Sequence, residues 1–521
     1  MAAAPPIPQA VQHRKKKIVI CCDGTGNEFG APNPDPANPS AGRNSNVVKL
    51  YTALQIDNHQ VGYYHPGVGT MGAPTATHWW SRQWTKIKGL AFGAGFSDNV
   101  IDAYRYLMEV YSDNGGNGNE DEVYIFGFSR GAYTARALAG LLHGYGLLCK
   151  GNEGHIPYAW RMYIAQHNDR LKKVVEPDGP FKQTFSHQNF RIHFIGVWDT
   201  VSSVGWISSP LRLFNLAQND TILRGRHAIS IDEHRCFFQD NLWGVSLPGQ
   251  DLVQAWFVGV HSDIGGSYSQ PETGLSDITL RWMLAEVGLL PDEDGIYPDK
   301  PGVLLNRPHY DLVLGRMPDP QVDPELLCIP PKSSCLHNSL TPGWWPLELI
   351  PHIFYNKDDG TEQRRVPLGL RRRQIPAGAL VHESVAQRLD ARAFQYKPSN
   401  VSRNELERPE NDPVPACADG THYYRFVPKG RKPNSKLFEY FDRFVVTWLF
   451  SIFDIVILIP VLTCIALAIA ATVLVPLAKI VSFLSRHIPH WAVWLIHVLI
   501  LWLGLLRAWL LGYIHMLQHV W

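Results

Sequence analysis

The 521-residue sequence contains only eight cysteines, and none of them forms a C-x-x-C pair. A zinc site of the usual spacing is therefore not expected. The cysteines are also too sparse for a disulfide scaffold, which favours a reducing compartment. A dinucleotide-binding fingerprint is missing as well, because Gly93 and Gly95 lack a third glycine and a preceding strand. We expect no cofactor.

The sequence also lacks an excess of charge, with 48 basic and 47 acidic side chains and a formal net charge of +1. Nucleic-acid binders carry a basic excess on some domain, so no nucleic-acid partner is expected. Residues 1–15 lack the apolar segment of a secretory signal peptide and are predicted to be disordered. The basic run at 14–17 is interpreted as a solvated entry to a strand or as a nuclear-localisation signal.

Apolar β-rich runs alternate with segments of helical periodicity in residues 16–290, the predicted catalytic domain. This order predicts an α/β fold with a mainly parallel sheet and helices on both faces. The expected strands are 17–22, 61–64, 122–128, 191–198 and 255–260, and the expected helices are 47–55, 98–111, 130–142 and 278–287.

Residues 291–440 have dense prolines and little periodicity, which predicts an irregular extension or cap over the core. Arginines cluster in this segment at 364–365 and 371–373. The cluster is interpreted either as a contact for lipid headgroups or as a solvated loop face.

Residues 441–521 form a hydrophobic C-terminal region, in which 455–478 has 24 residues without a formal charge. That length is sufficient to span a bilayer. A second run, 488–506, is predicted to span or to lie in the interface, and its tryptophans are typical of membrane interfaces. We expect one or two membrane helices; the alternative is a buried helical hairpin.

Basic residues just upstream of the apolar region favour a cytoplasmic catalytic domain: Lys429, Arg431, Lys432, Lys436 and Arg443. The linker 479–486 is also basic, which leaves the orientation open.

The segment Gly127-Phe128-Ser129-Arg130-Gly131 matches G-x-S-x-G between a predicted strand and a predicted helix. This is the context of the nucleophilic serine in the α/β-hydrolase fold. Gly127 and Gly131 are expected to remove Cβ atoms that would clash at the sharp turn. Ser129 is therefore the predicted nucleophile, and the alternative is a structural turn.

A base and an orienting acid should follow the serine in the order Asp/Glu and then His, each after a strand. Asp199 and His261 each come at the end of a later predicted strand, so we assign them these roles. Asp199 is alternatively a helix cap, and His261 a turn histidine.

The backbone N–H of Arg130 is the expected first oxyanion-hole donor. The turn after the first strand, Asp23-Gly24-Thr25-Gly26-Asn27, offers a second donor from Gly24 or Thr25. Its alternative is a plain Asx turn.

Five ordered blocks resemble an uncharacterised α/β-hydrolase family that includes bacterial type VI secretion phospholipase effectors. They are CDGT at 22–25, HPGVGT at 65–70, GFSRGAY at 127–133, GVWDTV at 196–201 and WFVGVHSDIGG at 256–266. The resemblance covers about residues 16–290. It implies a Ser-Asp-His triad at Ser129, Asp199 and His261, and phospholipase A-type ester cleavage. Asp23 is a further site candidate.

The first functional hypothesis is a membrane-bound serine esterase acting on phospholipid or another acyl ester. The second is a metallohydrolase in which His261, Asp263 and Asp23 ligate a metal. The third is a non-catalytic membrane scaffold on a hydrolase fold.

Overall fold

The computed structural model divides the chain into two compact units, Met1–Pro433 and Asn434–Trp521. The structure describes residues 15–24, 44–67, 96–115, 118–165, 179–201, 205–206, 209–210, 219–244, 246–268, 272–287, 302–306, 335–342, 344–349, 352–355, 362–367, 369, 372–391, 395–408, 417 and 420–429. All of them belong to the first unit.

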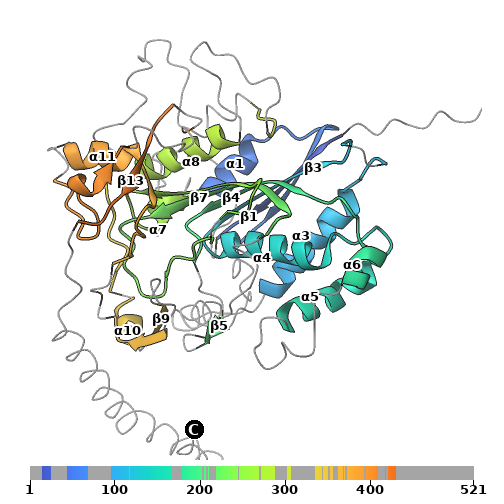
Figure 1. The fold of residues 1–521 in the computed structure, drawn as a ribbon, viewed down its shortest axis with the longest axis horizontal. Coiled ribbons are helices and arrows are strands. Elements are labelled where there is room, and N and C mark those ends of the chain that lie inside the picture. The colour runs from blue at the N-terminus through green and yellow to red at the C-terminus, as the bar shows by residue number, and fades with distance from the viewer. Residues whose placement is uncertain are drawn as a thin grey trace, which may run out of the picture. The chain divides into compact units, whose positions relative to one another are not determined.

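The described part is built on a nine-stranded sheet with the order β12-β13-β11-β8-β7-β4-β3-β1-β2 (Figure 1). All pairs from β2 to β11 are parallel, and β13 pairs antiparallel with both β11 and β12. The predicted α/β fold with a mainly parallel sheet is confirmed. The strands of this sheet are β1 Lys17–Cys22, β2 Gln60–His65, β3 Glu122–Phe128, β4 Ile192–Trp198, β7 Ile222–Ser230, β8 Asp251–Phe257, β11 Leu380–His382, β12 Leu406–Glu407 and β13 Tyr423–Phe426.

Two short antiparallel pairs stand apart from this sheet. They are β5 (Gly205–Trp206) with β6 (Ser209–Pro210), and β9 (His352–Tyr355) with β10 (Glu362–Arg365).

Helices cover both faces of the main sheet (Figure 1). One face carries α3 Phe96–Val110, α4 Arg130–Tyr145, α5 Ile156–Ala165 and α6 Gly179–Phe185, and the other carries α1 Asn46–Ala53 and α8 Gly274–Glu286. The other helical elements within the described residues are η1 Glu153–His155, α7 His261–Gly265, α10 Trp345–Glu348, α11 Glu383–Asp390 and η5 Arg403–Glu405.

The central strand β1 explains this layering. Its side chains alternate, with Ile18 and Ile20 packing in the core beside α3 and α4, and Val19 and Cys21 in the core beside α1 and α8. A strand buried on both faces is a continuous apolar run, which is why β1 and β3 are found at the predicted bounds.

Strand β7 was not predicted, because its sequence ILRGRHAIS carries three ionisable side chains. The tertiary structure gives ionic partners to the two arginines among them. Arg226 is buried and pairs with the buried Glu286 of α8 and with Asp251 of β8. Its guanidinium is thus accommodated in a central strand only because partners arrive from other elements.

The expectation of an irregular extension over 291–440 is corrected in part. β11, β12 and β13 lie in the main sheet, where Leu380 pairs with Ala255 of β8. Val381 and Phe426 pack in one apolar cluster with Trp256. These strands are only two to four residues long, too short for a period-2 pattern to be recognised among dense prolines.

Among the described residues, no helix has the length and apolar character needed to cross a bilayer. The apolar segments 455–478 and 488–506 lie outside those residues, as do residues 1–14. The expected membrane helices gain no support from the structure and stay a prediction.

The packing of β1 predicts different costs for two isoleucines. Ile20→Ala removes a fully buried side chain from the sheet core and should lower the free energy of unfolding by about 2 to 5 kcal/mol. Ile56 is 53% exposed, so Ile56→Ala should change it by less than about 0.5 kcal/mol. Urea denaturation followed by circular dichroism measures both, and equal destabilisation would contradict the assignment of β1 to the core.

Candidate active site

Ser129 is the single residue between the end of β3 and the start of α4. Its backbone has φ 59° and ψ −123°, a conformation that residues other than glycine rarely adopt and that costs on the order of 1–3 kcal/mol. The conformation is held on the β4 side, where the Ser129 N–H donates to the Trp198 carbonyl oxygen at 3.1 Å. The expected strand–serine–helix arrangement is therefore present.

The flanking glycines are required by close backbone contacts. A Cβ atom on Gly131 would lie 2.2 Å from the carbonyl oxygen of Cys22, and one on Gly127 would lie 2.6 Å from that of Gly131. These backbone atoms belong to packed elements, so their displacement would destabilise the fold. Gly127 and Gly131 thus allow α4 to start directly against the end of β1.

The structure brings Ser129, His261 and Asp199 together in one hydrogen-bonded chain. His261 Nε2 lies 2.7 Å from Ser129 Oγ, and His261 Nδ1 lies 2.6 Å from Asp199 Oδ2. All three residues are buried. Ser129, Asp199 and His261 follow β3, β4 and β8, respectively. The hydrogen-bonded series of these three side chains therefore lies at the carboxyl edge of the parallel strands.

Asp199 has further partners besides His261. The Ser230 N–H donates to Oδ1 at 2.9 Å, and the buried Arg373 places Nη1 on Oδ1 and Nη2 on Oδ2, the latter at 3.0 Å. Burial disfavours the charged form of Asp199. The positive charge of Arg373 and the hydrogen bond to His261 outweigh it and hold the pKa of the carboxyl well below its usual range.

Sequence reasoning missed Arg373 as a site residue. It lies in the arginine run 371–373, which was interpreted as a lipid contact or a solvated loop face. Its neighbour Arg372 is exposed, whereas Arg373 is buried. No local signal distinguishes the two, because the partner of Arg373 is 174 residues away in the sequence.

The imidazole of His261 is enclosed by two aromatic rings. The ring centroid of Phe128 lies 4.7 Å from that of His261, and the two planes are tilted by 30°. The ring centroid of Phe238 also lies 4.7 Å from that of His261, in an edge-to-face arrangement. Burial lowers the pKa of His261, and the neighbouring Asp199 only partly opposes this. The ring is consequently neutral near pH 7 and able to accept a proton from a hydroxyl group.

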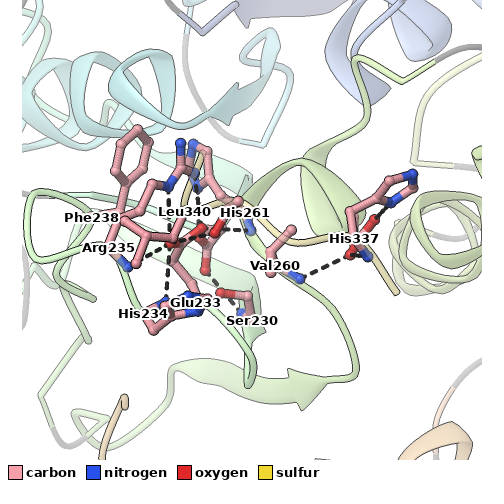
Figure 2. A network of polar contacts seen from close by, with 12 residues as sticks. Ser230, Glu233, His234, Arg235, Phe238, Val260, His261, His337 and Leu340 are labelled. Carbon is pink, nitrogen blue, oxygen red and sulfur yellow. Dashed lines mark hydrogen bonds and ion pairs between the residues drawn. The ribbon is translucent and has the colours of Figure 1, made fainter. Parts of the chain in front are cut away.

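Glu233 is a second buried carboxylate at this site that sequence reasoning missed (Figure 2). Its Oε2 accepts the His261 backbone N–H at 3.1 Å and Arg235 Nη2 at 2.8 Å, and its Oε1 accepts the Ser339 hydroxyl at 3.0 Å. Burial opposes its ionisation, but the charge of Arg235 prevails and lowers the pKa of Glu233 to about 2. Glu233 therefore holds the start of α7 as a charged anchor.

The glycines around His261 serve this packing. A Cβ atom on Gly265 would lie 1.9 Å from the ring of Phe128, which itself contacts His261. Gly259 has φ 127°, and a Cβ atom there would lie 2.4 Å from the Cβ of Asp263. The block at 256–266 thus combines a histidine with the small residues that let it approach β3.

The oxyanion-hole candidates differ in what the structure describes. The Gly24 N–H donates to Asp23 Oδ1 at 2.6 Å, and Thr25 lies outside the described residues. Arg130 begins α4, and the first amides of a helix have no partner within the helix. Their roles as donors stay predictions.

The side chain of Asp23 accepts hydrogen bonds from neighbouring residues. Its Oδ2 accepts the hydroxyl groups of Ser45 at 2.8 Å and Tyr64 at 2.9 Å, while Ser45 caps α1. Asp23 thereby ties the end of β1 to α1 and β2, next to the turn that Ser129 occupies.

The carboxylate of Asp263 forms its hydrogen bonds with groups other than the ring of His261. Its Oδ2 accepts the Val260 N–H at 3.0 Å, and its Oδ1 contacts His337 Nδ1 at 2.6 Å (Figure 2). The described residues contain no group of three or more His, Cys, Asp or Glu side chains arranged to hold a metal ion. The hypothesis that His261, Asp263 and Asp23 ligate a metal thus has no geometric support in this part of the chain.

Residues 16–286 match the model of the family described as "T6SS, phospholipase effector Tle1-like, catalytic domain". Ser129, Asp199, Glu233 and His261 lie within the match, while Ser339 and Arg373 lie beyond it. A curated relative is uncharacterized protein YEL023C of Saccharomyces cerevisiae, which is 34% identical over 238 residues. The match covers 43% of this chain, and the chain spans about a third (32%) of the yeast protein.

Two solved structures are similar to parts of the chain. An uncharacterized protein from Pseudomonas aeruginosa has a TM-score of 0.32 and 19% identity, covering 61% of this chain and 52% of its own. A Tle1 effector bound to the VgrG spike of the type 6 secretion system has a TM-score of 0.31 and 18% identity, covering 51% and 53%. The family match itself extends over more than half of the sequence. The chain belongs, through its catalytic domain, to the Tle1-like phospholipase effector family of the type VI secretion system.

Proposed function

We propose that this protein is a serine hydrolase that cleaves carboxylic esters through an acyl-enzyme. The observation that carries the proposal is the buried chain Ser129 Oγ–His261 Nε2 and His261 Nδ1–Asp199 Oδ2, at 2.7 and 2.6 Å. A hydroxyl, an imidazole and a carboxylate in this order form the arrangement that activates a serine for attack on a carbonyl.

In the proposed reaction His261 Nε2 accepts the proton of Ser129 Oγ as the oxygen attacks the acyl carbonyl. Asp199 keeps the Nδ1 proton in place and stabilises the imidazolium. The same nitrogen then donates its proton to the leaving alcohol, and a later water, deprotonated by His261, releases the acid. The Arg130 N–H and the positive end of α4 are the proposed stabilisers of the oxyanion.

The proposed substrate is a phospholipid or another lipid acyl ester. The family match supports lipid hydrolysis in general, since its description is that of phospholipase effectors. The buried ring of Phe128 and the partly buried ring of Phe238 contact the imidazole of His261 and place apolar surface beside the proposed nucleophile, which suits the acyl part of an ester substrate.

We further propose that residues 441–521 hold the enzyme at a membrane, with the catalytic domain on the cytoplasmic side. The support is the 24-residue run without a formal charge at 455–478 and the basic residues upstream of it. An anchored enzyme meets lipid at a raised effective concentration.

Ser129→Ala should abolish both hydrolysis of a phospholipid and ester panel and labelling by a fluorophosphonate, because no nucleophile remains. The expected loss of turnover is at least about 10⁴-fold. Ser399→Ala, which changes an exposed serine, should leave both rates unchanged. Full turnover in Ser129→Ala would refute the mechanism, and an unlabelled, inactive wild type would favour the non-catalytic scaffold.

The hydrolysis rate should fall as the pH drops through the pKa of His261, because the imidazolium cannot accept the serine proton. Burial lowers this pKa below the ordinary value of 6.5, so the midpoint of the acid limb of kcat/KM is expected below pH 6.5. A pH profile with a soluble ester measures it. A midpoint clearly above 6.5 would contradict the assignment of His261 as the base.

A chain ending at Pro433, the limit of the first compact unit, should keep hydrolysis of a soluble short-chain ester and lose co-sedimentation with phospholipid vesicles. Its turnover of vesicle lipid should fall, since the proposed anchor is missing. Equal vesicle binding by the full and shortened chains would remove the anchoring role from residues 441–521.

A further inference from the structure

The carboxylate of the proposed triad is held from a part of the chain that lies outside the family match. Residues 16–286 match the catalytic domain, and Arg373 follows 87 residues after its end. We propose that Arg373 is a positioning residue that fixes the Asp199 carboxylate, so that the hydrolase site is complete only with this later segment. This inference rests on the proposed function.

The contact between Arg373 and Asp199 uses both nitrogen ends of the guanidinium. Nη1 meets Oδ1, and Nη2 meets Oδ2 at 3.0 Å. A planar fork on a carboxylate determines the plane of that carboxylate, which a single hydrogen bond or a point charge does not. Because Oδ2 also receives His261 Nδ1, the orientation of the imidazole follows from the orientation of the fork.

Arg373 is itself anchored on both sides. Nη2 donates to the Phe238 carbonyl oxygen at 2.8 Å, and the Phe238 ring packs against His261. The backbone oxygen of Arg373 accepts Asn400 Nδ2 at 3.1 Å, and the same amide donates to Ile231 at 2.9 Å. The guanidinium is therefore a rigid support for Asp199 and a link to one wall of the site.

The charges that face His261 come in two opposed pairs. Asp199 lies at the end of β4, Glu233 and Arg235 lie after β7, and Arg373 arrives from the later segment. On α7 itself, Asp263 is paired with His337. The two buried carboxylates near the imidazole, Asp199 and Glu233, are thus each paired with an arginine. Burial keeps His261 neutral, and these pairings limit the opposing effect of the two carboxylates.

Removal of the Arg373 charge disturbs this balance in a known direction. The Asp199 carboxylate would keep its charge without its nearest cation, which favours the imidazolium form of His261. The acid limb of the rate profile should then move to higher pH. Lysine at this position would keep the positive charge but lose the planar fork, so charge and orientation can be separated by substitution.

The test compares Arg373→Gln and Arg373→Lys with wild type in the full chain, and uses Arg372→Gln as the matched control. Arg372 is the adjacent arginine and is exposed. The measurements are the rate of fluorophosphonate labelling of Ser129 against pH and the titration of His261 by ¹³C NMR, assigned with His261→Gln. Circular dichroism and urea midpoints report whether each variant folds.

Arg373→Gln should lower the plateau of the labelling rate by about 100-fold and move the acid limb to higher pH, because the carboxylate is released and its charge is unbalanced. Arg373→Lys should lower the plateau but keep the acid limb near that of wild type. Arg372→Gln should match wild type in both. A purely structural role for Arg373 would change the urea midpoint without this separation of plateau and limb.

A wild-type plateau and acid limb in folded Arg373→Gln would overturn the proposal. If Arg373→Gln does not fold, a wild-type plateau in Arg373→Lys overturns it instead. If wild-type Ser129 is not labelled, the proposed function fails, and the NMR titration of His261 decides the inference alone. A His261 pKa higher in Arg373→Gln than in wild type supports the inference, and an unchanged pKa refutes it. If Arg373→Gln is unfolded, a wild-type His261 pKa in Arg373→Lys supports the inference, and a changed pKa refutes it.

Discussion

The parallel alignment of β1, β3, β4, β7 and β8 is the constraint on which the rest of the described structure depends. Parallel strands end at the same edge of a sheet, and each is buried on both faces by helices. Ser129, Asp199 and His261 each follow one of these strands, so their approach is a consequence of sheet register. The proposed catalytic chain thus needs no flexible loop to assemble it.

This arrangement requires unfavourable local features. Ser129 and Asp199 both have positive φ values, and the buried charged side chains of Glu233 and Arg373 bind the His261 backbone and the Asp199 carboxylate. Such strain persists only where the surrounding packing determines it. Close contacts through Gly131 and Gly265 supply that packing, because they press β1 and α7 against the turn that carries Ser129.

The later segment of the chain is part of this site. Arg373 binds Asp199, Ser339 binds Glu233 and His337 binds Asp263, each across more than seventy residues of sequence. β11 and β13 extend the same sheet beside β8, which brings this segment to the carboxyl edge. Buried carboxylates near a neutral histidine need compensating partners, wherever in the chain these partners originate.

Local patterns determined much of this protein in advance. The apolar runs at Lys17–Cys22 and Glu122–Phe128 predicted strands with correct bounds, and the glycine-flanked Ser129 predicted the turn between β3 and α4. Strand ends and chain order were enough to select Asp199 and His261, which the structure brings into contact with Ser129. Burial and turn geometry act on neighbouring residues, so they leave a periodic or positional signature in the sequence.

Only the tertiary structure decided which charged residues are buried. Arg226 is buried in a central strand and Arg373 is buried against the carboxylate of Asp199, while Arg372 is exposed, although all three are arginines with polar sequence neighbours. An ion pair depends on where two distant segments meet, and that meeting is set by the packing of the whole sheet. For the same reason the short strands β11 and β13 are recognisable only in the tertiary structure, where β11 pairs with β8 and β13 pairs with β11.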